Sequence, residues 1–241
     1  MPVLYLHPIG LDGHVWDEVA VDGGLTPSFP GFGDTLRLDE PPSFDAMVEF
    51  VAAQLDGPAD IVGCSLGSMV AQHVAVERPD LVRSLVLACG AGRTSAEAAR
   101  QRAAAARAGG MTAVLPSTLE RWLTPDALGD DGHPGVRYVR DRLLRDDPEV
   151  FASYWDFMAG HDMLDALGQI RAPVTVIAGE SDRAAPVSAM AETAARIPGA
   201  RFEPMPGPHI LPLENAAGLR EAVARHLQLL GSPAQNRAQS S

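Results

Sequence analysis

Residues 59–71 read Ala-Asp-Ile-Val-Gly-Cys-Ser-Leu-Gly-Ser-Met-Val-Ala, an apolar run that leads directly into a Gly-x-Ser-x-Gly motif. Glycines two residues before and two after Ser65 permit a sharp strand-to-helix turn, because a side chain at either position would collide with a neighbouring strand or helix. We expect Ser65 at the apex of this turn, where the N-terminus of the next helix favours developing negative charge. An ordinary glycine-flanked junction has the same pattern, so the surrounding sequence has to decide between them.

Composition excludes several classes of protein. The 241 residues are 46% hydrophobic, enough for one large domain or for a domain with an insertion. The net charge of −12 disfavours nucleic acid or an anionic membrane as a partner. All 19 basic residues are arginines, and without lysine the chain cannot be a Schiff-base enzyme, a pyridoxal phosphate enzyme or a P-loop NTPase. A small-molecule substrate is the expected partner, and assembly into a homo-oligomer stays open.

The two cysteines and the N-terminus predict the compartment. Cys64 and Cys89 each end an apolar run and are typical of small buried residues, although a disulfide between adjacent strand ends is conceivable. Two cysteines without a basic, cleavable leader favour a reducing, cytoplasmic location. No apolar run is long enough to span a bilayer.

The apolar pattern alternates between the periods of strands and helices. Such alternation predicts an α/β fold with a mostly parallel, doubly wound sheet. Ser43 is a suitable N-cap for an amphipathic helix. The expected strands cover residues 2–6, 25–29, 59–64, 85–88, 172–178 and 201–205, and the expected helices cover 15–19, 43–55, 68–77, 187–197 and 219–230.

Residues 91–165 differ from the rest of the chain. They contain short helical segments without a convincing strand, and nine of the 19 arginines lie between Arg93 and Arg145. Thr94 and Glu97 form a capping-box pattern at the start of the first helix. The predicted organisation is therefore a sheet domain built from residues 1–90 and 166–230, a helical cap inserted at 91–165, and a disordered tail at 231–241.

Three residues at predicted strand ends suggest nucleophilic catalysis. Ser65 lies in the turn, Asp182 follows a later strand, and His209 lies in the loop after the final strand. Open parallel sheets place their sites at the carboxyl ends of strands, and the chain order Ser, Asp, His is that of the α/β-hydrolases. An imidazole activates the hydroxyl, and a carboxylate holds the tautomer of that imidazole.

An acyl-transfer site also needs backbone donors for an oxyanion. One is the N–H after the nucleophile, which belongs to Leu66. The second is expected from the loop after the first strand, where Pro8 has no N–H, so Ile9 is the better candidate. We expect His7 to brace this loop rather than to take part in the chemistry.

Over nearly its whole length the chain resembles the α/β-hydrolases, and specifically their β-ketoadipate (3-oxoadipate) enol-lactonase branch. The motifs that carry the resemblance are Gly-Cys-Ser-Leu-Gly-Ser-Met-Val-Ala-Gln at residues 63–72, Arg-Ala-Gly-Gly-Met at 107–111 and Glu-Arg-Trp-Leu-Thr-Pro at 120–125. The resemblance implies a triad of Ser65, Asp182 and His209, with oxyanion donors at Ile9 and Leu66. The chain departs from the family at its N-terminus, where it lacks the usual antiparallel strand pair, and at His7-Pro8, where the family has His-Gly.

Three side chains of the predicted cap are candidates for substrate binding. Arg121 and Trp122 are candidates to line the pocket, Arg121 by pairing with a substrate carboxylate, although a solvated cap arginine is equally plausible. Trp155 recurs at helical spacing with Phe151 and Met158, a pattern typical of a core that can also form a pocket wall.

We predict no metal and no cofactor. His161 beside Asp162 has no suitably spaced second histidine, so a cap-surface or pocket-wall histidine is favoured. Residues 130–133, Asp-Asp-Gly-His, are typical of a solvated polar turn between cap helices.

The sequence therefore predicts a serine hydrolase that cleaves a small ester or lactone through an acyl-enzyme. Carbon–carbon bond hydrolysis and cofactor-free perhydrolysis of the haloperoxidase type are alternatives on the same triad. A non-catalytic ligand-binding protein on the hydrolase scaffold is a further alternative from a different class.

Overall fold

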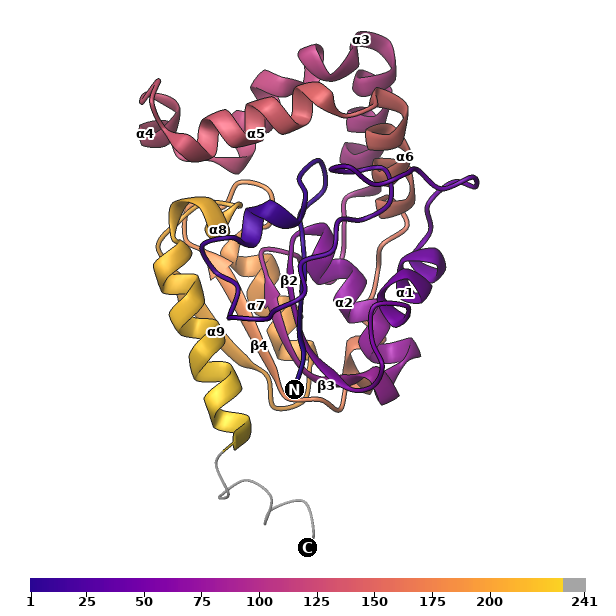
Figure 1. Cartoon of the computed structure of the whole chain (residues 1–241), viewed down its shortest axis with the longest axis vertical. Helices are drawn as coiled ribbons and strands as arrows, with labels where there is room; N and C mark the ends of the chain where they lie inside the picture. The colour runs from indigo at the N-terminus through magenta and orange to yellow at the C-terminus, as the bar shows by residue number, and fades with distance from the viewer. Residues whose placement is uncertain (232–241) are drawn as a thin grey trace, which may run out of the picture.

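The fold is built on one parallel five-stranded sheet with the strands in the order β1-β2-β3-β4-β5. The structure, a computed structural model, describes residues 1–231 (Figure 1). Every pairing between these strands is parallel. The predicted tail therefore lies, apart from its first residue, outside the described residues. The strands are β1 (Val3–Leu6), β2 (Ala59–Cys64), β3 (Val82–Ala88), β4 (Val174–Gly179) and β5 (Arg201–Met205).

Helices cover both faces of the sheet, so the central strands are apolar along their length. All six residues of β2 and all six of β4 are buried. Helices α1 (Phe44–Ala52) and α2 (Leu66–Glu77) lie on one side and α9 (Ala216–Gly231) on the other (Figure 1). Short connecting helices are η1 (Gly13–Trp16), η2 (Pro79–Leu81), η3 (Leu167–Gln169), α7 (Val187–Arg196) and α8 (Leu211–Glu214).

Most predicted elements are present, and the differences lie between β1 and β2. No strand covers residues 25–29; Leu25 makes one isolated bridge to Leu4 at the outer side of β1. The prediction was wrong because Pro27 and Pro30 lack the N–H that would continue a ladder. The helix expected at 15–19 is the 3-10 turn η1. Ser43 caps α1 as predicted, since its side chain accepts from the N–H of Ala46.

Four helices connect β3 to β4 and stand together at one end of the sheet (Figure 1). We call α3 (Ala96–Trp122), α4 (Pro125–Leu128), α5 (Pro134–Arg145) and α6 (Pro148–Met158) the cap helices. Gly110 interrupts α3 with φ 66° and ψ −174°, so α3 is two helices joined at a kink. The capping box predicted at Thr94 is wrong: Ser95 is the N-cap, and the Thr94 N–H instead donates to His161 O.

An ionic network joins the cap helices to the loop after β1. Arg142 on α5 pairs with Asp12 (Nε–Oδ2 2.9 Å) and with Asp146 (Nη2–Oδ1 2.8 Å), and all three side chains are largely buried. The Tyr138 hydroxyl donates to the same Asp12 carboxylate at 2.7 Å. The loop after β1 is therefore tied directly to α5.

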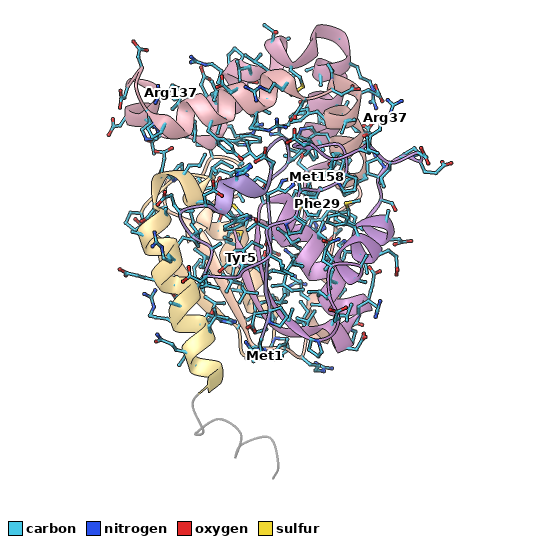
Figure 2. The ribbon with its side chains drawn as sticks, in the orientation of Figure 1. Met1, Tyr5, Phe29, Arg37, Arg137 and Met158 are labelled. Carbon is cyan, nitrogen blue, oxygen red and sulfur yellow. The ribbon has the colours of Figure 1, made fainter. Side chains whose placement is uncertain are left out.

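The core is continuous from the sheet into the cap. Tyr5, Phe29 and Met158 point inward, whereas Arg37 and Arg137 reach outward at the periphery (Figure 2). Both cysteines are buried and neither forms a disulfide, in agreement with their prediction as small buried residues. Within residues 1–231, no helix has both the length and the apolar character needed to cross a membrane.

Candidate active site

Ser65 lies at the turn between β2 and α2 in a backbone conformation that few side chains adopt. Its φ is 54° and its ψ is −115°, a strained combination that costs roughly 1–3 kcal/mol. A Cβ atom at Gly63 would overlap the carbonyl of Gly67, and one at Gly67 would overlap the carbonyl oxygen of Leu6 on β1. The predicted reason for both glycines is therefore confirmed, and the tight approach holds Ser65 above the sheet edge.

Ser65, His209 and Asp182 form one hydrogen-bonded line. The Ser65 Oγ lies 2.9 Å from His209 Nε2, and His209 Nδ1 lies 2.9 Å from Asp182 Oδ2. An ionised carboxylate only accepts, so Nδ1 carries the proton and leaves Nε2 free to accept from the Ser65 hydroxyl. All three residues are buried. The structure thus brings together side chains that are 144 residues apart in the chain.

The surroundings of Asp182 favour its ionised form. Its Oδ1 accepts from the backbone N–H groups of Ala184 and Ala185, at 2.7 and 2.9 Å. Burial acts to raise the pKa of Asp182, but the charge and hydrogen bond of His209 and these two donors together lower it below its ordinary value. The carboxylate is therefore fixed as an acceptor for His209.

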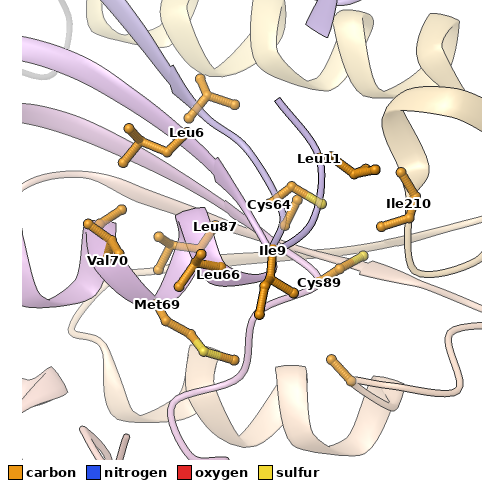
Figure 3. Packing of buried hydrophobic residues seen from close by; sticks show 14 of the residues in the cluster. Leu6, Ile9, Leu11, Cys64, Leu66, Met69, Val70, Leu87, Cys89 and Ile210 are labelled. Carbon is orange, nitrogen blue, oxygen red and sulfur yellow. The ribbon is translucent and has the colours of Figure 1, made fainter. Parts of the chain in front are cut away.

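The loop after β1 brings a second backbone donor near the turn. Ile9 and Leu66 both belong to the buried core around Cys64 and Cys89, whose packing Figure 3 shows. Ile9 lies in the turn after β1 and Leu66 is the first residue of α2, and within residues 1–231 the N–H of neither residue donates a hydrogen bond. Both are therefore free to act on a ligand, although neither residue lines the cavity described below.

His7 braces this loop. Its Nε2 accepts from the Phe29 N–H at 2.8 Å, so Nδ1 carries the proton and donates to Pro8 O at 2.7 Å. Burial lowers the pKa of His7 to about 4 and keeps the ring neutral. This geometry agrees with the structural role expected for His7.

A cavity of about 130 Å³ opens at Ser65 and His209. Its wall includes the three side chains that the sequence singled out for substrate binding, Arg121, Trp122 and Trp155. It also contains residues that the sequence analysis did not single out, among them Met69, Cys89 and Arg102. Arg102 was missed because no periodicity distinguishes it from the other arginines of the cap.

The remaining candidates lie elsewhere. His161 is buried between the core and the cap, where it contacts His73 and its Nε2 donates to Ala91 O at 3.0 Å, so its prediction as a surface or pocket-wall histidine is wrong. Residues 130–133 form the predicted turn between α4 and α5.

One set of three side chains among residues 1–231, Cys89, Asp182 and His209, has ligand atoms within 4.8 Å of one another. Two of the three already hydrogen-bond to each other in the line described above. We therefore interpret this set as part of the serine site and assign no metal to it.

The parallel sheet, the glycine-flanked serine turn and the Ser–His–Asp line define an α/β-hydrolase. The chain belongs to the alpha/beta hydrolase family, whose model matches residues 3–222. A pimeloyl-acyl-carrier-protein methyl ester esterase of Neisseria meningitidis serogroup C is 31% identical over 206 residues, 76% of each chain.

Two similar proteins carry the name enol-lactonase. A 3-oxoadipate enol-lactonase of Acinetobacter baylyi is 28% identical, covering 68% of this chain and 62% of its own. The crystal structure of the enol-lactonase from Burkholderia xenovorans superposes with a TM-score of 0.89 at 25% identity, covering 94% of this chain and 91% of that one. The predicted α/β-hydrolase enzyme and its resemblance to the enol-lactonases are confirmed, and the relatives include esterases as well as lactonases.

Proposed function

We propose that this chain hydrolyses a small carboxylic ester or lactone through an acyl-enzyme on Ser65. The observation that carries the proposal is the line Ser65–His209–Asp182, with both contacts at 2.9 Å, beside a cavity of about 130 Å³ that Ser65 and His209 line. The names of the relatives support an ester bond as the target, since one acts on a methyl ester and others on an enol-lactone.

The reaction follows from the protonation states of the line. His209 Nε2 takes the proton of Ser65 Oγ as that oxygen attacks the carbonyl carbon, and the resulting oxyanion accepts from the N–H groups of Ile9 and Leu66. The intermediate collapses, and the leaving alcohol oxygen takes the proton from His209. Water then loses a proton to His209, attacks the acyl carbon, and releases the acid and a free Ser65. Asp182 orients His209 and stabilises its cationic form throughout.

Residues 91–165 form the cap in this proposal, over a core of residues 1–90 and 166–230. The cavity wall opposite Ser65 comes from the cap helices, through Arg121, Trp122 and Trp155. Aromatic walls suit a compact acyl group, and the Arg121 guanidinium suits a carboxylate on it. The cap therefore sets substrate shape, whereas the core supplies the chemistry.

Labelling with a fluorophosphonate, read by intact mass, tests the nucleophile. We expect one adduct per chain in the wild type, none in Ser65→Ala, and full labelling in the control Ser153→Ala, whose hydroxyl only bonds to Val150 O in α6. A panel of aryl acetates, methyl esters and enol-lactones then gives the bond class. An unlabelled wild-type protein, or one that labels without turning over any ester or lactone, would overturn the proposal.

A further inference from the structure

Two chambers share four residues of the cap helices. The inner chamber is the 130 Å³ cavity at Ser65, and the outer chamber, of about 190 Å³, lies between the two halves of α3 and α6. Ala98, Arg102, Arg121 and Trp155 line both chambers, and we call the last three, which carry polar groups, the partition residues. The outer chamber has exposed residues at its rim, among them Gln101 and Ser117.

The partition residues hold buried hydrogen-bond donors that have no acceptor. Within the described chain, Arg121 Nε and Nη2 and Trp155 Nε1 are shielded from solvent and make no hydrogen bond. The remaining Arg121 bond is a long one, from Nη1 to Ser117 O at 3.3 Å. Buried donors without acceptors are uncommon because each costs roughly 1–3 kcal/mol. Trp16, Arg83 and Arg142 also hold one buried donor each that makes no hydrogen bond, but among residues 1–231 the orphaned donors that belong to the walls of the two chambers are those of Arg121 and Trp155.

Positive charge outweighs negative charge at the same place, where Asp182 attracts Arg121 without forming a salt bridge with it. The Arg102 guanidinium lies 4.8 Å from the centre of the Trp155 ring and that of Arg121 lies 5.9 Å from it, so two cations share one aromatic ring. No carboxylate of the described residues forms a salt bridge with either guanidinium. Burial, and for Arg121 also repulsion from Arg102, lowers the pKa of both groups, that of Arg121 to about 10. Both still carry their charge at neutral pH.

Three other arginines of the cap region have acidic partners. Arg107 pairs with Glu149 and Asp156, Arg142 pairs with two aspartates, and Arg93, which also lines the inner chamber, pairs with Asp162. The remaining cap arginines form no salt bridge within residues 1–231 but are exposed to solvent, namely Arg100, Arg137, Arg140 and Arg145. Among the described residues, Arg102 and Arg121 are therefore the half-buried arginines of the cap region that have no acidic partner. An ordinary solvated face does not account for this difference, because the orphaned Arg121 atoms are inaccessible to water.

We propose that Arg102, Arg121 and the Trp155 indole N–H form an anion subsite for a carboxylate at the far end of the acyl group whose ester carbonyl meets Ser65. The inference rests on the proposed function and deepens it, because it adds Arg102 and places the charge between the chambers rather than at the serine. The preferred substrate class is then the half-ester or lactone of a dicarboxylic acid. A planar carboxylate accepts from both guanidiniums at once and removes their mutual repulsion.

A matched pair of substrates isolates the charge. The monomethyl esters of C4 to C8 dicarboxylic acids are compared with their terminal carboxamides, which have the same shape and no charge. We expect kcat/KM to favour the carboxylate by roughly ten- to a hundredfold at one best chain length, the range set by one or two charged hydrogen bonds. The preference arises mainly in KM, since the subsite contacts a part of the substrate that does not react.

Three variants locate the preference. Arg102→Met and Arg121→Met each keep a long apolar side chain, and we expect each to reduce the carboxylate-to-carboxamide ratio of kcat/KM at least about fivefold. Arg100→Met removes the same charge from an exposed position of the same helix and is expected to leave the ratio unchanged. In Ser65→Ala, the free dicarboxylate of the best length should quench tryptophan fluorescence, and Arg102→Met should weaken that binding.

The outcomes separate this inference from the proposed function. Equal turnover of carboxylate and carboxamide esters by an active, labelled enzyme overturns the anion subsite and leaves the hydrolase intact. The anion subsite is also overturned if Arg100→Met lowers the preference for the carboxylate as much as Arg102→Met does. The preference would then come from long-range attraction to the positive charge of the cap. Loss of turnover for every ester contradicts the proposed function itself.

Discussion

At the scale of single residues, the position of Ser65 depends on the missing side chain of Gly67. Because a Cβ there would overlap the Leu6 carbonyl of a neighbouring buried strand, Gly67→Ala is expected to destabilise the protein by roughly 3 kcal/mol or more. Gly57→Ala is the matched control, since a Cβ at Gly57 meets nothing within 4 Å. Urea unfolding midpoints measure both. Similar midpoints for the two variants would contradict the close approach of α2 to β1.

A second residue-scale prediction concerns Asp182. Asparagine keeps the size of the side chain, but its amide group favours the wrong imidazole tautomer, with the proton on Nε2. We expect Asp182→Asn to lower kcat by roughly 10³- to 10⁴-fold with little change in KM. Asp162 is exposed and pairs with Arg93. The variant Asp162→Asn is the control and should retain activity. Steady-state kinetics on a neutral aryl ester decides, and a kcat within tenfold of wild type would exclude the assigned role.

At the scale of elements, the strands and the three residues of the serine line were predictable because each depends on local pattern. Continuous apolar runs identify strands that are buried on both faces, and Gly63 and Gly67 identify the turn. Proximity of Ser65 to His209 follows from parallel topology, since both follow the carboxyl ends of strands.

The geometry of the cap helices was not predictable in the same way. The kink at Gly110 resembles any glycine within a helix-forming segment, and its φ of 66° is a tertiary feature. Arg102 differs from its neighbour Arg100 only in what packs around it, and no sequence period records this difference. The same holds for Leu25, whose single bridge depends on where the loop after η1 meets β1.

The ionisable side chains that join α5 to the loop after β1 make the stability of the protein depend on pH. Burial raises the pKa of Asp146 to about 8, despite attraction to Arg142. The unfolded chain releases this proton near the ordinary value of 3.8, whereas the folded chain holds it, so the free energy of unfolding falls as the pH rises from about 4 to about 8. Asp146→Asn keeps the side chain neutral and should remove this loss.

We therefore expect Asp146→Asn to be more stable than the wild type at pH 8, by roughly 1–3 kcal/mol, and similar to it near pH 5. Urea denaturation at both pH values measures the difference. Asp141→Asn, an exposed aspartate on the same helix, controls for the change in net charge. A stability difference that is independent of pH would mean that Asp146 is ionised in the folded protein.

At the scale of the whole molecule, the proposed function takes its chemistry and its selectivity from different parts of the fold. Ser65, Asp182 and His209 are held by loops at the carboxyl ends of sheet strands, whereas the opposite wall of the cavity comes from helices inserted between β3 and β4. This division agrees with a family whose named members include both esterases and lactonases.

Neutral histidines are buried in three parts of the molecule, and they predict how its stability changes in acid. His7 lies in the loop after β1, His161 between the core and the cap, and His226 between α9 and β4, where its Nδ1 meets the Thr175 hydroxyl at 2.8 Å. Burial lowers the pKa of each to about 4. Below pH 6.5 the unfolded chain therefore binds protons that the folded chain does not, and stability is lost as the pH falls from 6.5 to 4.

The variant His226→Asn isolates the contribution of one buried histidine to this loss of stability. Asparagine retains an acceptor for Thr175 and cannot become charged. Over pH 6.5 to 4, we expect its unfolding free energy to fall less steeply than that of the wild type, by up to roughly 1.4 kcal/mol per pH unit. His14→Asn, at an exposed histidine, should reproduce the wild-type slope. If the unfolding free energies of His226→Asn and the wild type change in parallel with pH, His226 takes up its proton in the folded state as readily as in the unfolded state. The acid sensitivity then has to be sought at His7 and His161.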